Sequence, residues 1–110
     1  MNVLPIDRAS TEAAINRLID LARSDTGQAR RAANFLMAWW NGPDLGHFEI
    51  ADLFGLDLEI AADIGTVIGY LGQHSGAVYM DAFGYRDEMQ NIIARWRAPT
   101  APEAAIASSD

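Results

Sequence analysis

The sequence contains no cysteine and no lysine, and it has no long hydrophobic run. Without cysteine the chain cannot form disulfides, thiolate metal sites or cysteine nucleophiles. No apolar run approaches the roughly 18–20 residues that a membrane helix needs, and no basic region followed by an apolar stretch predicts a signal peptide. We therefore expect a single small cytoplasmic domain, in a chain of 110 residues, with no membrane partner.

Because lysine is absent, eight arginines carry all the positive charge against fifteen acidic residues, which gives a net charge of −7. The segments 1–40 and 86–110 are each close to neutral. The segment 41–85 has no arginine and holds seven acids: Asp44, Glu49, Asp52, Asp57, Glu59, Asp63 and Asp81. Such a segment repels nucleic-acid phosphates and attracts basic surfaces, so direct nucleic-acid binding is not expected.

Four segments show the helical spacing of apolar residues, and they span about 10–24, 26–40, 58–73 and 85–97. Ser10 or Thr11 is expected to cap the first helix. Asp25 with Gln28 resembles a capping box for the second helix, and Asp57 is expected to cap the third.

Two further segments complete the expected fold. Asn41-Gly42-Pro43-Asp44 should end the second helix, with Gly42 in a left-handed conformation, because Pro43 cannot continue the helix. Residues 47–54 are predicted to form a short helix, although Phe48-Glu49-Ile50 would also suit an extended stretch. The prediction is an all-α, compact bundle of four main helices plus one short helix, with an N-terminal arm at 1–9, a helical domain at 10–97 and a flexible tail at 98–110.

The predicted helix at 58–73 has one face without side-chain bulk. This face contains Ala62, Gly65, Gly69 and Gly72 and continues to Gly76. Glycine inside a helix is unfavourable, so several glycines on one face indicate a requirement for packing or binding there. We expect another helix to pack closely there inside the fold, while a shallow groove for a partner or a homodimer contact are the alternatives.

The acidic segment and the aromatic residues supply the predicted partner-binding site. Trp39 and Trp40 cannot point the same way on a helix, so one of them could be an exposed interface anchor, unless both are buried. The residues expected to bind a protein partner are Asp44, Glu49, Asp52, Glu59 and Asp63 as charges, with Trp39 and Tyr70 as aromatics. The alternative is that the acids form only a solvated face with helix-capping aspartates.

No residue pattern predicts catalysis, a cofactor or a metal. His47, Glu49 and Asp52 are close in sequence, but they match neither zinc spacing nor a calcium loop. His74 and Ser75 are neighbours, which says nothing of a nucleophile and its base. The sequence has no glycine-rich phosphate loop between a strand and a helix, so we expect a protein that is not an enzyme.

Residues 29–41, Ala-Arg-Arg-Ala-Ala-Asn-Phe-Leu-Met-Ala-Trp-Trp-Asn, resemble a family of short bacterial proteins known only as a domain of unknown function. The segments Phe48-x-x-x-Asp52-Leu53-Phe54-Gly55-Leu56-Asp57 and Arg95-Trp96-Arg97 extend the similarity over about residues 15–97. The resemblance implies no activity and no catalytic residue, but members are common on plasmids, prophages and other mobile elements, which also encode anti-CRISPR proteins. We therefore expect a non-enzymatic inhibitor of anti-CRISPR type, which occupies a basic surface of a nucleic-acid-handling complex such as a CRISPR effector complex. A structural or regulatory homodimer is the alternative.

Overall fold

The computed structural model describes residues 5–97, so the predicted tail at 98–110 and the first four residues lie outside the described part. In chain order the elements are α1 (Arg8–Ala22), α2 (Gly27–Leu45), the 3-10 helix η1 (Ile50–Gly55), α3 (Leu58–Gly72), the 3-10 helix η2 (Met80–Phe83) and α4 (Arg86–Trp96). Within residues 5–97 no segment forms a strand. The predicted all-α bundle of four main helices is confirmed. The short helix expected at 47–54 is the 3-10 helix η1, which begins only at Ile50, and the second 3-10 helix, η2, was not predicted.

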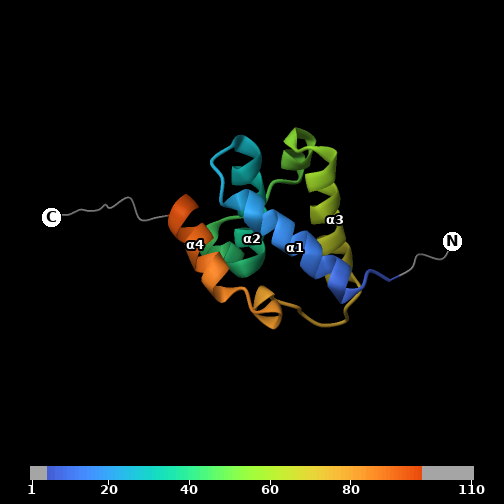
Figure 1. Cartoon of the computed structure of the whole chain (residues 1–110). Helices are drawn as coiled ribbons and strands as arrows, with labels where there is room; N and C mark the ends of the chain where they lie inside the picture. The colour runs from blue at the N-terminus through green and yellow to red at the C-terminus, as the bar shows by residue number, and fades with distance from the viewer. Residues whose placement is uncertain (1–4, 98–110) are drawn as a thin grey trace.

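Helix α1 is the centre of the bundle, since it packs against α2, α3 and α4 (Figure 1). Its apolar stripe is buried, and the first half of α2 buries three alanines, Ala29, Ala32 and Ala33. Small side chains let two helix backbones approach closely, so the larger residues of the core gather farther along α2, at Leu36 and Met37. Helix α3 contributes only Ile64 and Val67 as fully buried residues, which leaves much of this helix facing outward.

The first two helix caps differ from the prediction. Asp7 caps α1, because its carboxylate accepts the backbone N–H of Ser10 at 2.6 Å, and the helix therefore begins at Arg8 rather than near Ser10. Thr26, not Asp25, caps α2 by accepting the N–H of Ala29. A run of adjacent residues that can all serve as caps fixes the region of a helix start, but it does not fix the residue.

The helix break in α2 lies where the sequence predicted it, but the chain becomes helical again after it. Asn41 has non-helical angles (φ −163°, ψ 74°), and a further turn then runs to Leu45 with Pro43 inside it. The prediction that Gly42 would be left-handed is wrong. A positive φ occurs instead at Gly46 (φ 106°), whose N–H donates to the carbonyl of Gly42 at 2.8 Å.

Among residues 5–97, no other helix covers the glycine face of α3, which corrects the expectation of close helix packing. A Cβ atom built at Gly65 or Gly72 would meet no atom of these residues within 4 Å. At Gly69 the neighbour is not a helix but Ile6, in the arm that precedes α1. Gln73 holds this arm through hydrogen bonds with both the backbone N–H and the carbonyl of Ile6.

Candidate protein-binding surface

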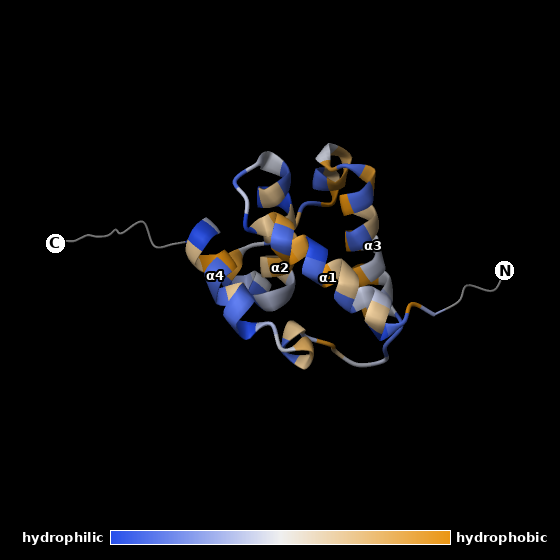
Figure 2. Cartoon of the chain, in the orientation of Figure 1, coloured by the Kyte–Doolittle hydropathy of each residue, from blue (hydrophilic) through white to orange (hydrophobic). Residues whose placement is uncertain are grey.

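Three large apolar side chains are exposed where η1 meets the start of α3. Ile50, Phe54 and Leu58 are 68%, 89% and 87% exposed, and we call this group the apolar corner. Figure 2 shows hydrophobic colour on the outside of the fold at this place, at the top of α3. Isolated exposed apolar residues are ordinary, but several together mark an interaction site.

Carboxylates border the apolar corner because the chain places them next to Ile50 and Leu58. Glu49 precedes Ile50, Asp57 precedes Leu58 and Glu59 follows it, and all three are exposed. Asp57 occupies the cap position of α3, as predicted, but its side chain does not cap the helix. Instead the carboxylate accepts a hydrogen bond from Gln28 Nε2 at 3.1 Å, while Gln28 Oε1 accepts the N–H of Asp57.

Arginines from the first 40 residues neutralise part of the acidic segment. Arg17 on α1 donates two hydrogen bonds to Asp63, at 2.8 and 3.0 Å, and these bonds raise the pKa of the Arg17 guanidinium. Arg31 on α2 lies 3.6 Å from the carboxylate of Asp52. Near the end of α1, Arg23 lies 3.5 Å from the carboxylate of Asp20.

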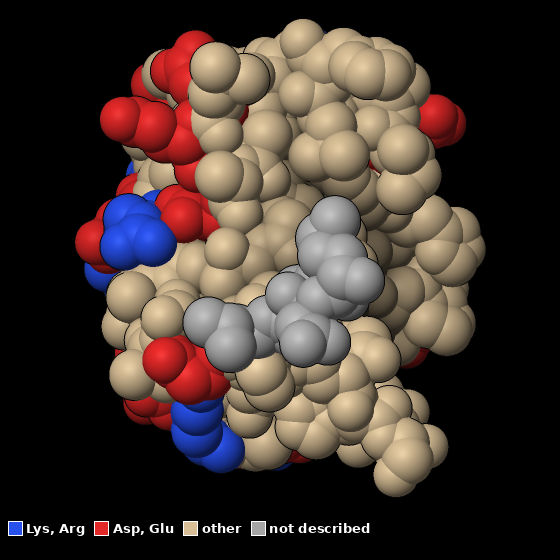
Figure 3. All heavy atoms as spheres, turned by 90° about the vertical axis from the view of Figure 1, so that its right-hand side faces the viewer, with Lys and Arg blue, Asp and Glu red and all other residues tan. Residues whose placement is uncertain are grey.

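The remaining charge of the acidic segment is concentrated at one place. Of its seven acids, Asp52, Asp63 and Asp81 each have an arginine within 4 Å. Among residues 5–97, no such arginine is found for Asp44 or for Glu49, Asp57 and Glu59, and the last three border the apolar corner. Figure 3 shows the side of the molecule where α3 lies, with a broad uncharged surface and carboxylates along its margins.

The other predicted partner-binding residues lie elsewhere. Asp44 follows the break in α2, where its carboxylate accepts a hydrogen bond from Asn41 at 3.0 Å. Trp39 is half-buried, and its indole N–H donates to the carbonyl of Val78 at 2.9 Å. Tyr70 is also half-buried and packs against Phe83, so neither aromatic joins the apolar corner.

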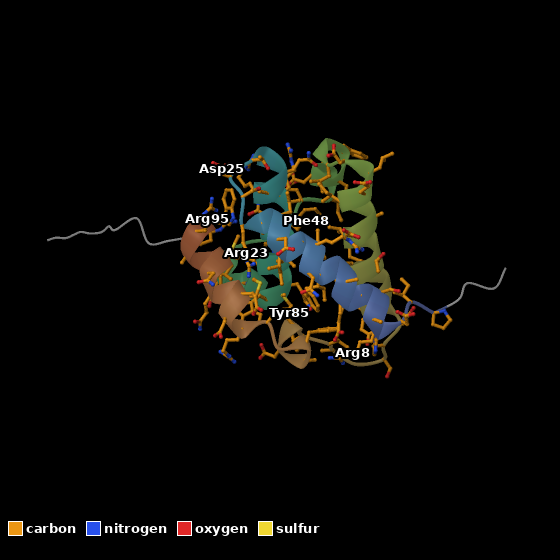
Figure 4. All side chains as sticks on the ribbon, viewed as in Figure 1. Arg8, Arg23, Asp25, Phe48, Tyr85 and Arg95 are labelled. Carbon is orange, nitrogen blue, oxygen red and sulfur yellow. The ribbon has the colours of Figure 1, made fainter. Side chains whose placement is uncertain are left out.

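Phe83 is the centre of a second cluster, which closes the lower end of the bundle. The rings of Trp39 and Tyr70 each lie 6.0 Å from Phe83, and the guanidinium of Arg8 lies 4.5 Å above it. Tyr85 stacks nearby, and burial together with the charges of Glu12 and Glu88 raises its pKa. Figure 4 shows Arg8 and Tyr85 at this end of α1. The cluster joins the loop before α4 to the core, which is a structural role.

Side chains at the end of α4 donate hydrogen bonds to backbone carbonyls at and just after the end of α1. The spacing of residues in the sequence did not reveal this contact. The indole N–H of Trp96 donates to the carbonyl of Ala22 at 2.7 Å, and Arg95 Nε donates to the carbonyl of Ser24 at 3.1 Å. Ala22 is the last residue of α1, where helical carbonyls lack partners, and Ser24 lies in the turn that follows. Figure 4 shows Arg95 on the same side of the molecule as Arg23 and Asp25, beside the turn between α1 and α2.

No group of three or more histidine, aspartate and glutamate side chains within residues 5–97 is placed to share a metal ion. In the same part of the chain, no helix has both the length and the hydropathy that crossing a membrane requires. The distinguishing feature of the described surface is therefore the acid-bordered apolar corner.

Taken together, the fold and this surface define an all-α helical-bundle domain with one exposed apolar corner. A family model matches residues 12–97, and the chain belongs to that family, which is described as a family of unknown function (DUF7673). The matched region extends from α1 to Arg97 and so includes the η1–α3 surface. No curated protein and no solved structure matches the chain.

Proposed function

We propose that this domain is a non-enzymatic protein-binding module whose apolar corner docks on a partner with a basic surface. The observation that carries the proposal is the exposure of Ile50, Phe54 and Leu58 beside three carboxylates without an arginine partner among residues 5–97. Burial of a large apolar side chain contributes roughly 1.5–3 kcal/mol, and an aromatic residue at the centre of an interface is a common hot spot. We assign Phe54 as this anchor, in place of Trp39.

The carboxylates determine which partner the corner suits. Glu49, Asp57 and Glu59 would accelerate association with a surface rich in arginine or lysine and would disfavour an acidic one. Surfaces that bind nucleic acids are rich in these residues. A protein that covers such a surface can inhibit by occupancy alone, without a catalytic group.

The most specific form of the proposal is a mobile-element inhibitor of anti-CRISPR type, acting in the cytoplasm. In this form the carboxylates lie where nucleic-acid phosphates would otherwise bind. Its support is the acidic border of the corner and the family resemblance of Ala38-Trp39-Trp40-Asn41.

The test uses the purified full chain as bait in lysates of its host and of CRISPR-bearing bacteria, at low and moderate salt. We expect capture of a basic nucleic-acid-binding protein, lost with Phe54→Ser and weakened by Glu49→Lys and Glu59→Lys. Asp44→Lys is the matched control, because it makes the same charge change away from the corner.

Two results would count against the proposal at different levels. A partner that Phe54→Ser retains as well as the wild type does not use the corner, which would end the proposal. Normal nuclease activity of purified CRISPR effector complexes in the presence of excess protein would remove only the anti-CRISPR form.

A further inference from the structure

The apolar corner lies partly on a segment that has few contacts with the core. No residue of η1 is fully buried, and of its apolar side chains Leu53 packs partly against the core. Leu56, which follows η1, is buried. Segments with few buried apolar contacts open locally at low free energy. The position of Phe54 therefore depends on what else holds η1 in place.

Two polar side chains of α2 hold this segment. Gln28 and Arg31 are three residues apart, so they lie on one side of the helix. Arg31 Nη1 donates to the carbonyl of Gly55 at 3.3 Å, and Arg31 Nε lies 3.6 Å from the carboxylate of Asp52. Gln28 binds Asp57 twice, through the backbone N–H at 2.8 Å and through the carboxylate at 3.1 Å. These contacts, which we call the α2 clamp, tie η1 and the start of α3 to α2.

Gly55 lets the guanidinium of Arg31 lie directly against the backbone of η1. A Cβ atom built at Gly55 would be 2.7 Å from Arg31 Cζ and 2.9 Å from Arg31 Nη1. Gly55 is not among the glycines with a positive φ, so what it provides is this close approach and not an unusual backbone conformation. Arg31 Nε is also shielded from solvent. The guanidinium is thus packed against η1, whereas the two sides of an exposed ion pair hold each other only weakly.

We infer that Gln28 and Arg31 are positioning residues, which keep the apolar corner formed before a partner binds. Phe54 and Leu58 each stand next to a clamped residue in the chain. A surface that is already ordered loses less conformational entropy when it binds, which favours affinity. This benefit rests on the proposed function, whereas the clamp itself is a property of the free chain.

The two clamp residues also differ in what they do to the charge of their partners. Arg31 brings a positive charge to Asp52 and so offsets the charge of that carboxylate. Gln28 fixes the carboxylate of Asp57 through a neutral amide, so Asp57 keeps its full negative charge. The clamp therefore holds in place one of the carboxylates that a basic partner would meet beside the corner.

The first experiment is amide hydrogen exchange of the free full chain, followed residue by residue by NMR. Two amides report on the clamp, since the N–H of Leu56 bonds back to η1 and the N–H of Asp57 bonds to Gln28. We expect Arg31→Ala to speed exchange at both amides roughly three- to tenfold, the factor that one or two hydrogen bonds supply. Exchange within α1 should not change.

Arg30→Ala is the matched control, because it removes the same charge from an exposed neighbour on α2. Gly55→Ala tests the contact itself. It should speed exchange at the same two amides when Arg31 is present and have no such effect in the Arg31→Ala background, where the guanidinium is absent. Unchanged exchange in Arg31→Ala, or equal acceleration throughout α1, would overturn the inference.

The second experiment measures the order of the corner directly and uses the absence of cysteine. Phe54→Cys gives a single site for a nitroxide label, whose mobility is read from its electron paramagnetic resonance spectrum. We expect Arg31→Ala to raise this mobility and Arg30→Ala to leave it unchanged. A label at residue 54 that is equally mobile with and without Arg31 would show that the clamp does not order the corner. If the clamp orders the corner but Phe54→Ser retains the captured partner, the proposed function fails and the inference about the clamp stands.

Discussion

Gly65 and Gly69 are one turn apart on the same helix, yet we expect alanine to act differently at the two positions. An alanine at Gly65 meets no atom of the described residues within 4 Å, so the substitution should stabilise the fold by the full difference in helix propensity, about 0.8–1 kcal/mol. At Gly69 the same gain is opposed, because the new Cβ would lie 2.5 Å from Ile6 Cδ1. Ordinary contacts begin near 3.4 Å, so the side chain of Ile6 must move away by about an ångström.

The free-energy cost of moving the Ile6 side chain can be estimated from its burial. Burying an isoleucine completely is worth roughly 1.5–3 kcal/mol, and Ile6 is half-buried, so displacing it costs about 1 kcal/mol. We therefore expect Gly69→Ala to leave the free energy of unfolding nearly unchanged. In the Ile6→Ala background no Cδ1 atom lies over residue 69. Gly69→Ala should then raise the free energy of unfolding by the same amount as Gly65→Ala.

The assay is urea unfolding followed by circular dichroism. The four proteins of the Ile6–Gly69 cycle give a coupling energy of about 1 kcal/mol if the two side chains meet as described. Equal stabilisation by Gly69→Ala in both backgrounds would show that Ile6 does not lie over the helix. A loss of stability in Gly65→Ala would show that the space above Gly65 is occupied in the monomer.

Three further predictions concern the ends and the centre of the bundle. Trp96→Phe should lower the free energy of unfolding by about 1 kcal/mol in urea titrations, because it removes the N–H bond to Ala22 at 2.7 Å; Trp40→Phe is the control. The hydrogen bonds from Ser10 lower the pKa of Asp7 below 3.8, so its ionised form stabilises the fold above that pH, and this contribution is lost as the pH falls through the lowered pKa. Asp7→Asn keeps a capping oxygen and should flatten the stability-versus-pH curve in that acid range, as measured by thermal melts. Leu36→Ala should cost about 2–5 kcal/mol in urea titrations, since Leu36 is completely buried.

The long helices could be predicted from the sequence because each carries its own apolar stripe. The third helix was expected at 58–73 and runs Leu58–Gly72, since its apolar spacing defines it locally. The capping residues could not be predicted, because Asp7 and Ser10, or Asp25 and Thr26, can each accept a backbone N–H at a helix start. Choosing between them depends on backbone angles that tertiary packing sets.

The candidate surface could be predicted from the sequence only in part, because the exposure of a side chain depends on packing. The acids near Ile50 and Leu58 could be read from the sequence, but the exposure of Phe54 depends on which side of η1 packs on the core, and no local pattern reveals that. Phe48 and Phe54 both belong to the segment predicted as one short helix. Yet Phe48 packs against Phe35 at 5.5 Å between ring centres, whereas Phe54 faces solvent.

Arginine supplies all the positive charge, and this explains why the net charge of a sequence segment is a poor guide to the charge that the folded segment presents at its surface. A guanidinium has five N–H donors in a plane and can bind oxygens from several elements at once, which a lysine ammonium does less well. Arg97 shows this use, since it donates both to the carbonyl of Leu45 and to Asn34 Oδ1. Arg17 makes its paired bonds to Asp63 across 46 residues of sequence, so the partners of each acid are set by the fold and not by spacing. An acid of the 41–85 segment is therefore available to a partner only where the helices bring no arginine to it, and that condition is met at Glu49, Asp57 and Glu59 beside the apolar corner.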